Sequence, residues 1–234
     1  TVRIAYEPCL ARVIISDEQA KEIQKYYDRC ADQGSTAEQI EESKKAMNKM
    51  RVILGVPSRL HKLAVDIADH YDAMCAEKPD IVQKAMIVCS DRQIAYDLLQ
   101  EILSVREDWG IPRKAEHEES LSKEKLDKLL PLPKINLVAT QGKDDNKALF
   151  DACGNKEYRK MLDKQFKNTD SNFTIAIVVD MWITGFDVPS LAVMYIDKPL
   201  QKHTLIQTIS RVNRVFEGKD KGLVVDYIGI KDEM

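Results

Sequence analysis

Residues 84–105, KAMIVCSDRQIAYDLLQEILSV, decide the fold class of this chain. The stretch 85–89 is a continuous apolar run, which is typical of a strand buried on both faces of a parallel sheet. Ser90 and Asp91 end the run and are expected to cap a helix, because apolar residues then recur at helical spacing from Ile94 to Ile102. A buried strand followed at once by an amphipathic helix predicts an α/β fold.

Strands and helices continue to alternate towards the end of the chain. We predict further strands at 135–139, 174–179, 191–196 and 223–225, and helices at 155–166 and 203–216. Right-handed crossovers then imply one parallel sheet with helices on both faces. Such sheets bind their ligands at the carboxyl ends of the strands. The expected functional positions are therefore Ser90, Thr140, the loop 180–187 and the 203–216 helix.

Residues 1–80 are predicted to be an N-terminal strand and a mainly helical extension, and residues 81–234 to form the α/β domain. The alternating residues 1–6 and the β-prone run 10–15 are candidate strands. The capping patterns at 16–19 and 36–39 predict helices to about residues 30 and 54. A third helix follows Pro57 to about Glu77.

The two histidines of the third helix and the charged segment 105–130 carry little predicted chemistry. His61 and His70 do not share a helical face, so we interpret them as parts of a solvated helix and not as metal ligands. The highly charged residues 105–130 predict a long loop with one helix over 120–130. The composition of this loop favours poor order.

Composition limits the function classes. A chain of 234 residues can hold one large α/β domain or two small ones. The net charge of -3 gives no global basic field, so any anion site must be local. Five cysteines without a CxxC pair favour free thiols in a reducing cytoplasm over a zinc site. No apolar run approaches the ~18 residues of a membrane span. Because the chain opens without Met inside an alternating pattern, we expect a piece of a longer polypeptide.

The stretch 203–216, HTLIQTISRVNRVF, is the first candidate site. At ~100° per residue, His203, Gln207, Arg211 and Arg214 fall on a stripe roughly 80° wide, opposite an apolar stripe. The polar stripe contains no acid and offers donors that suit an anion. An arginine-bearing surface helix is the other interpretation of the same pattern.

The loop 180–190, DMWITGFDVPS, is the second candidate. Gly185 permits a close approach or a positive φ, and Asp187 could bind a ribose hydroxyl or position a metal-bound water. A tight turn capped by Asp187, with Trp182 in the core, explains these residues equally well. The chain has no G-x-x-x-x-G-K-[ST] loop, no nuclease motif and no defensible Ser-His-Asp or Cys-His arrangement. It therefore offers anion donors without a phosphate cradle, which is half of a site.

Several segments resemble known motor proteins in the same order along the chain. Gln207-x-x-x-Arg211-x-x-Arg214 resembles motif VI of superfamily 2 helicases and translocases, VVDMWITGFD (178–187) resembles their motif V, and 86–90 takes the place of motif IV. The longer segments IAYEPCLARV, IAIVVDMWITGFDVPSLAVMYIDKPL, QTISRVNRVF and GLVVDYIGI resemble the motor (R) subunit of type I restriction enzymes. This resemblance spans nearly the whole chain.

The resemblance implies a second RecA-like motor domain that closes on ATP held by a first. Arg214 matches the arginine-finger position and Arg211 the other arginine of motif VI, while Gln207 supports that helix or contacts the nucleotide. Gly185 and Asp187 match the motif V positions that face the nucleotide.

Ser90, Arg92 and Thr140 lie where such domains touch the DNA backbone. One position departs from the pattern, because Val179 stands where many superfamily 2 proteins carry a phosphate-contacting Thr. That departure puts the motif V contact with DNA in doubt. His203 receives no settled role.

The resemblance also implies ATP and Mg²⁺ in the parent enzyme, held mainly by the first motor domain. The implied partners are double-stranded DNA, the first RecA-like domain of the same parent chain, and modification and specificity subunits, in a bacterial or archaeal cytoplasm. Alone, the chain is expected to show neither ATPase nor nuclease activity. Two alternatives stay open: the second domain of another superfamily 2 motor, and a non-enzymatic α/β module that docks an anionic partner.

Overall fold

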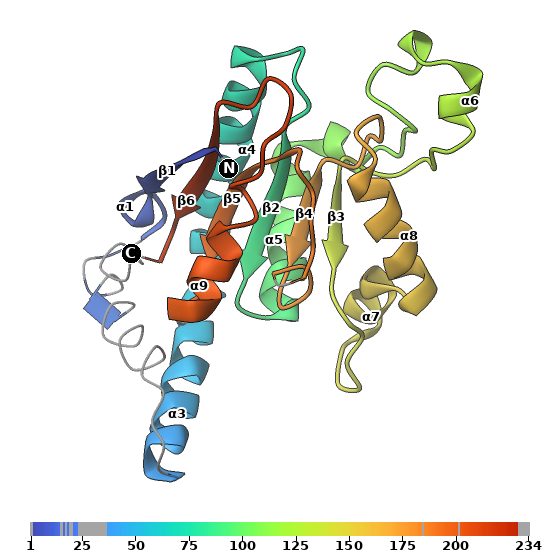
Figure 1. Cartoon of the computed structure of the whole chain (residues 1–234). Helices are drawn as coiled ribbons and strands as arrows, with labels where there is room; N and C mark the ends of the chain where they lie inside the picture. The colour runs from blue at the N-terminus through green and yellow to red at the C-terminus, as the bar shows by residue number, and fades with distance from the viewer. Residues whose placement is uncertain are drawn as a thin grey trace.

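A parallel sheet forms the centre of the molecule (Figure 1). The computed structural model describes residues 2–14, 16, 18, 21, 22, 37–183, 185–200 and 202–228. Within these residues, six strands form one sheet in the order β1-β6-β5-β2-β4-β3. Each of its strand pairings is parallel. The predicted α/β fold class is confirmed.

The strands match the apolar runs of the sequence. Their bounds are β1 Arg3–Pro8, β2 Lys84–Cys89, β3 Ile135–Val138, β4 Ile175–Val178, β5 Leu191–Asp197 and β6 Lys221–Asp226. Every residue of β2, β3, β4 and β5 is buried, because helices cover both faces of these strands. β1 lies at the edge of the sheet and pairs only with β6 among the described strands.

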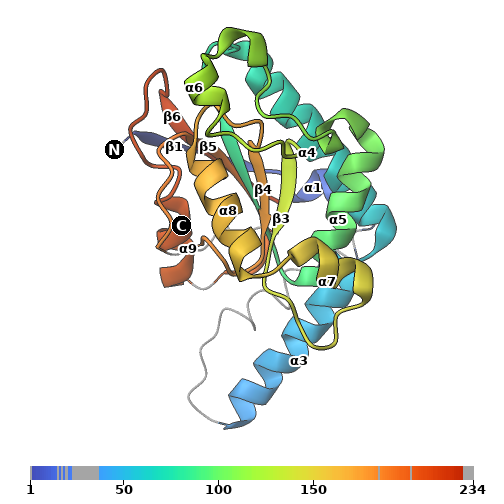
Figure 2. The same cartoon turned by 90° about the vertical axis from the view of Figure 1, so that its right-hand side faces the viewer.

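Helices lie on both faces of the sheet, as predicted. Figure 2 shows α8 and α9 on one face and α4 and α5 on the other. The helices are α1 Leu10–Val13, α3 Ala37–Leu54, α4 Pro57–Glu77, α5 Arg92–Val105, α6 Lys123–Leu126, α7 Lys147–Cys153, α8 Lys156–Lys167 and α9 Lys202–Ile209. Asp91 caps α5 as predicted, since its side chain accepts a hydrogen bond from the backbone of Ile94.

Outside the candidate site, two local predictions are wrong and one helix was not predicted. The β-prone run 10–15 contains the short helix α1 instead of a strand, because the chain leaves the sheet edge after Cys9 and buries Val13 beside α4. The helix predicted over 120–130 is the single turn α6. α7 was not predicted, although Asn146 caps its start and Gly154 ends it with φ 60°. The helix predicted over 16–30 lies mostly outside the described residues.

The charged segment 105–132 is anchored and not a featureless loop. It contains two 3-10 turns, Glu107–Gly110 and Glu118–Ser120. Trp109 is buried and packs edge-on against Tyr71 of α4. A backbone bridge between Arg113 and Leu132 closes the segment.

A buried ion pair joins α4 to the carboxyl end of β5. Arg59 donates two hydrogen bonds to Asp197, at 2.5 and 3.1 Å, and both side chains are fully buried. One of its nitrogens also donates to the carbonyl of Leu54, the last residue of α3. This pair holds α4 and the end of α3 against the carboxyl ends of the strands, where ligands are expected.

Candidate functional site

The residues predicted from the sequence lie at one edge of the sheet. Ser90 follows β2, Thr140 follows β3 and the loop 180–187 follows β4. Because all strands are parallel, their carboxyl ends meet at this edge. The structure divides these residues into an arginine group, a serine group and a third group around Thr140.

The arginine group begins with a correction to the 203–216 prediction. α9 ends at Ile209, and residues 210–212 form a turn in which the backbone N–H of Arg211 donates to the carbonyl of Thr208. Arg214 is therefore not on the helical stripe that the periodicity predicted. Ser210 bonds back to the carbonyl of Gln207, and Val212 is buried against β6.

A glycine of β6 makes this turn possible. A Cβ at Gly222 would lie 2.2 Å from the carbonyl oxygen of Val212, closer than any side chain tolerates. Residues 210–212 therefore pack against β6 and do not extend the helix. Gln207 stays exposed on α9, and the side chain of His203 lies outside the described part of the molecule.

Arg211 holds the loop after β4. Its guanidinium donates to the carbonyls of Ile183 and Phe186, at 3.4 and 3.2 Å. The loop itself is tight, because Trp182 and Gly185 both adopt positive φ, 67° and 73°. Since a Cβ at Gly185 would meet no atom within 4 Å, the backbone angle and not lack of space favours glycine there.

Trp182 anchors this loop from inside. Its ring is buried and stacks on Phe186 with centroids 4.1 Å apart and an interplanar angle of 4°. Phe166 of α8 packs beside both rings. The core-packing interpretation of Trp182 is confirmed, and it is compatible with a functional loop because the outward residues remain accessible.

Arg214 and Asp187 form the accessible part of the arginine group. The guanidinium Nε lies 3.1 Å from the carboxylate of Asp187, and the two side chains are 49% and 59% exposed. The structure thus brings Gly185, Asp187, Arg211 and Arg214 together, with Gln207 on the helix that precedes them. Residues of the two segments therefore lie side by side, and the second segment reaches the loop through a turn and not through one helix.

Ser90 and Arg92 form the second group. Arg92 donates to Asp145 at 2.7 Å, and Asp145 also accepts from the backbone of Gly142 at 2.6 Å. The Oγ of Ser90 and the Nε of Arg92 are buried without a hydrogen-bond partner among the described residues. A groove of about 500 Å³ lies here, lined in part by Ser90, Arg92, Asn48 and Arg51.

Thr140 lies in a different setting. It is exposed and lines a shallow cavity of about 560 Å³ with Met181, Trp182 and basic residues of α8. The described basic residues of this cavity are Lys156, Arg159, Lys160 and Lys164. The sequence reasoning missed them, although 156, 160 and 164 recur at a spacing of four and mark one helical face.

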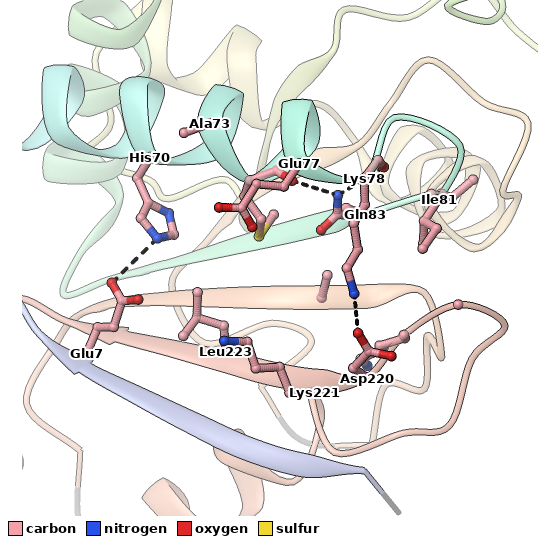
Figure 3. Close-up of a pocket in the computed structure, with 15 residues that line it drawn as sticks. Glu7, His70, Ala73, Glu77, Lys78, Ile81, Gln83, Asp220, Lys221 and Leu223 are labelled. Carbon is pink, nitrogen blue, oxygen red and sulfur yellow. Dashed lines mark hydrogen bonds and ion pairs between the residues drawn. The ribbon is translucent and has the colours of Figure 1, made fainter.

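Another cavity, of about 320 Å³, lies between α4 and the β6–β1 end of the sheet (Figure 3). His70 faces Glu7 across it, with the Nε2 of the imidazole 3.5 Å from the carboxylate, and Lys78 is paired with Asp220. Its lining mixes three lysines with three carboxylates and therefore favours no ligand charge.

Metal ligands and membrane spans are not evident in the described part of the chain. His70 bonds the hydroxyl of Tyr195 at 2.8 Å, and no group of three or more His, Cys, Asp or Glu side chains is placed to hold a metal there. Cys9, Cys75, Cys89 and Cys153 are free thiols, and Cys30 lies outside the described residues. None of the described helices combines the length and apolar character that a membrane span requires.

The parallel sheet, with its arginines beside the loop after β4, defines an α/β domain whose candidate site lies at the carboxyl ends of the strands. Residues 113–229 match the family model for type I restriction enzyme subunit R domain 3. The chain belongs to the R-subunit family of type I restriction enzymes.

Named relatives agree with this assignment. The type I restriction enzyme HindI endonuclease subunit of Haemophilus influenzae is 33% identical over 83% of this chain. The SauCOLORF180P endonuclease subunit of Staphylococcus aureus is 45% identical over 33% of it. The chain spans 17% of the length of the first relative and 9% of the second.

Two solved structures resemble this chain at low sequence identity. S. cerevisiae Dbp5 bound to RNA and ADP BeF3 is 11% identical, with a TM-score of 0.44 over 96% of this chain and 52% of that one. The C-terminal part of the Fun30 ATPase domain is 11% identical, with a TM-score of 0.42 over 96% of this chain and 85% of that one.

Proposed function

We propose that this chain is the second motor domain of an ATP-dependent DNA translocase, within the R subunit of a type I restriction enzyme. The observation that carries the proposal is the arrangement of two arginines beside the loop after β4. Arg211 is committed to loop carbonyls, whereas Arg214 is half-exposed on Asp187. One arginine positions the loop, and the other is available to a ligand.

Arg214 has the chemistry of an arginine finger. Its guanidinium is always charged and offers planar donors that match phosphate oxygens. An arginine finger stabilises the charge on a transferring phosphoryl group and is worth roughly 10³–10⁵ in rate. Because the pair with Asp187 is exposed, exchanging the carboxylate for a phosphate costs little.

The nucleotide would be shared between two domains. Gly185, Asp187 and Gln207 would line the nucleotide from this side, and the first RecA-like domain would hold the triphosphate and Mg²⁺. When bound, Mg²⁺ neutralises charge on the phosphates. The donor set here fits an anion better than a metal ion, since Asp187 is the one carboxylate in the arginine group and it is paired.

The surface near the arginine group suits a partner domain. Ile206 on α9 and Val215 beside Arg214 are 69% and 65% exposed, although both are large apolar residues. We assign this surface to the first RecA-like domain, which would cover it when the two domains close on ATP.

DNA would contact the edge formed by Ser90, Thr140 and α8. The basic face of α8 is exposed beside Thr140, and such side chains bind phosphates without reading sequence. Arg92 is held by Asp145 and would orient the Ser90 loop. Val179 offers no hydroxyl, and its carbonyl accepts from Lys198. The recognition sequence would then be read by the specificity subunit, with the modification subunit as the other partner.

The test combines this chain with the first motor domain of the same R subunit, expressed separately. We expect no ATP turnover from either piece alone and DNA-stimulated turnover from the mixture. Turnover by this chain alone would overturn the proposal. Failure of duplex DNA to stimulate a mixture that does form a complex would favour an anion-docking module.

A further inference from the structure

Helix α3 lies outside the sheet and beside the edge proposed to meet DNA. Figure 1 shows it running past the carboxyl ends of the strands. Residues Ala46, Met50 and Leu54 are buried on one side of the helix. The other side is exposed and carries Lys44, Lys45, Asn48, Lys49 and Arg51. On this side Lys45 is paired with Glu41, one turn earlier in the helix, and both side chains are 69% exposed.

A contact at the end of α3 fixes the direction of this face. The Nε of Arg51 lies 2.5 Å from the carboxylate of Asp91, and the same carboxylate caps α5 directly after Ser90. Lys44, Asn48 and Arg51 are spaced i, i+4 and i+7, so they share a stripe about 60° wide. Because Arg51 points to the strand ends, the stripe follows the same side of the helix.

The stripe continues a groove that the proposed DNA edge already contains. Asn48 and Arg51 line the groove of about 500 Å³ together with Ser90 and Arg92. The carboxylates Asp91, Asp145 and Asp180, which also line it, are each paired with a cation. Asp144 is the remaining acid of the groove.

The order of charges along α3 favours an anionic partner. Its acids, Glu38, Glu41 and Glu42, fall in the first turns, and the stretch 44–54 contains four cations and no acid. Basic residues near a helix C-terminus also suit the helix dipole, but this effect falls off within the last turn. Lys44 and Lys45 lie too far from the C-terminus for that explanation.

We propose that α3 is a basic arm that extends the DNA-backbone contact beyond the edge of the sheet. Lys44 on this stripe, and Lys45 and Lys49 beside it on the exposed side of the helix, would bind phosphates of a duplex seated against Ser90, and Asn48 would add a neutral hydrogen bond. Lys45 would exchange its exposed ion pair with Glu41 for a phosphate. The inference rests on the proposed function, because it takes duplex DNA as the polyanion. It adds a contact surface contributed by a helix that precedes the first buried strand.

The test measures binding of this chain to a fluorescent 30-base-pair duplex by anisotropy, across a series of KCl concentrations. The variant is Lys44→Gln, Lys45→Gln, Lys49→Gln, since glutamine keeps helix propensity without charge. Each lost phosphate contact reduces the slope of log K against log salt by about 0.9, so three contacts reduce it by about 2.7. We expect at least a tenfold loss of affinity at 50 mM KCl.

A matched control removes three lysines elsewhere: Lys123→Gln and Lys125→Gln on α6, and Lys128→Gln two residues after it. Figure 1 shows α6 at the end of the molecule opposite α3. The same net charge change there should leave the salt slope unchanged. If both variants lower affinity equally, or neither does, the arm is overturned while the proposed function stands. If the unaltered chain binds no duplex at all, the DNA edge of the proposed function fails and the arm with it.

Discussion

Two arginine–aspartate pairs in this molecule differ mainly in burial. Arg59 and Asp197 join α4 to β5 through two hydrogen bonds, and both side chains are 0% exposed. Arg214 and Asp187 meet through one contact of 3.1 Å, and their side chains are 49% and 59% exposed. The charges are the same, but water reaches only the second pair.

This difference separates anchoring from ligand binding. A buried pair cannot lose one partner cheaply, because the remaining charge would stay desolvated. An exposed pair contributes about 0–1 kcal/mol and can exchange one anion for another. Arg59 is therefore suited to hold α4 in place, and Arg214 to leave Asp187 for a phosphate.

The largest expected effect belongs to the exposed pair. Arg214→Ala, assayed with the first motor domain and duplex DNA, should lower ATP turnover by roughly 10³–10⁵ because the transition-state charge loses its donor. The free energy of unfolding of this chain should change by less than about 1 kcal/mol. Turnover within tenfold of the unaltered chain would show that Arg214 is only a surface residue. Arg113→Ala, an exposed cation outside both the arginine group and the proposed DNA edge, is the matched control.

The buried pair should show the opposite profile. Arg59→Ala should lower the free energy of unfolding by about 3–5 kcal/mol, because Asp197 is left as an uncompensated buried charge. Urea titration followed by circular dichroism measures this loss. Replacing both partners, as Arg59→Met with Asp197→Leu, should recover most of it. A single variant as stable as the unaltered chain would contradict the anchoring role.

The sequence predicted the sheet well for a physical reason. β2, β3, β4 and β5 are buried on both faces, so each appears as an uninterrupted apolar run. The short helix α1 was missed because its β-prone side chains are placed by the turn at the sheet edge and by burial against α4, not by local preference. α7 could have been predicted from Asn146 and Gly154, which cap its two ends.

The sequence predicted that the candidate residues lie at the strand ends, but not the geometry of the segment after α9. Helical periodicity continues through Val212, yet the chain leaves the helix after Ile209 because Val212 packs where Gly222 leaves room. Val212 is buried in the turn three residues after Ile209, and a residue buried on the same face of a continued helix would have the same spacing. The pairing of Arg59 with Asp197 spans 138 positions, and no local pattern encodes such a partner.

Lys84 extends the comparison of buried and exposed charges, because its hydrogen-bond partners are neutral backbone carbonyls and not a carboxylate. Lys84 donates to the carbonyls of Phe166, Asn168 and Phe173, and burial lowers its pKa to about 7. Between about pH 7 and the ordinary value of 10.5, the unfolded chain therefore binds more protons than the folded chain. The free energy of unfolding should rise with pH in this window, by up to about 1.4 kcal/mol per pH unit.

The check is the pH dependence of the difference between the unaltered chain and Lys84→Met. Taking the difference removes groups common to both chains, including Lys219, whose pKa burial lowers to about 8. A difference that stays constant from pH 7 to 10 would mean that Lys84 keeps its proton in the folded chain. The three carbonyl partners would then offset the cost of desolvating the charged amine, and a buried lysine could stay charged without a carboxylate partner.

The smallest expected effect is on the acid of the exposed pair. Asp187→Asn keeps the shape of the side chain and removes its charge, so the free energy of unfolding should fall by less than about 1 kcal/mol. Asp197→Asn, the same change in the buried pair, should cost several times more because Arg59 loses its counter-charge. Paired urea titrations of the two variants measure the ratio. Equal costs would mean that burial does not distinguish the pairs, and Arg214 would then be held as firmly as Arg59 and unsuited to exchange Asp187 for a phosphate.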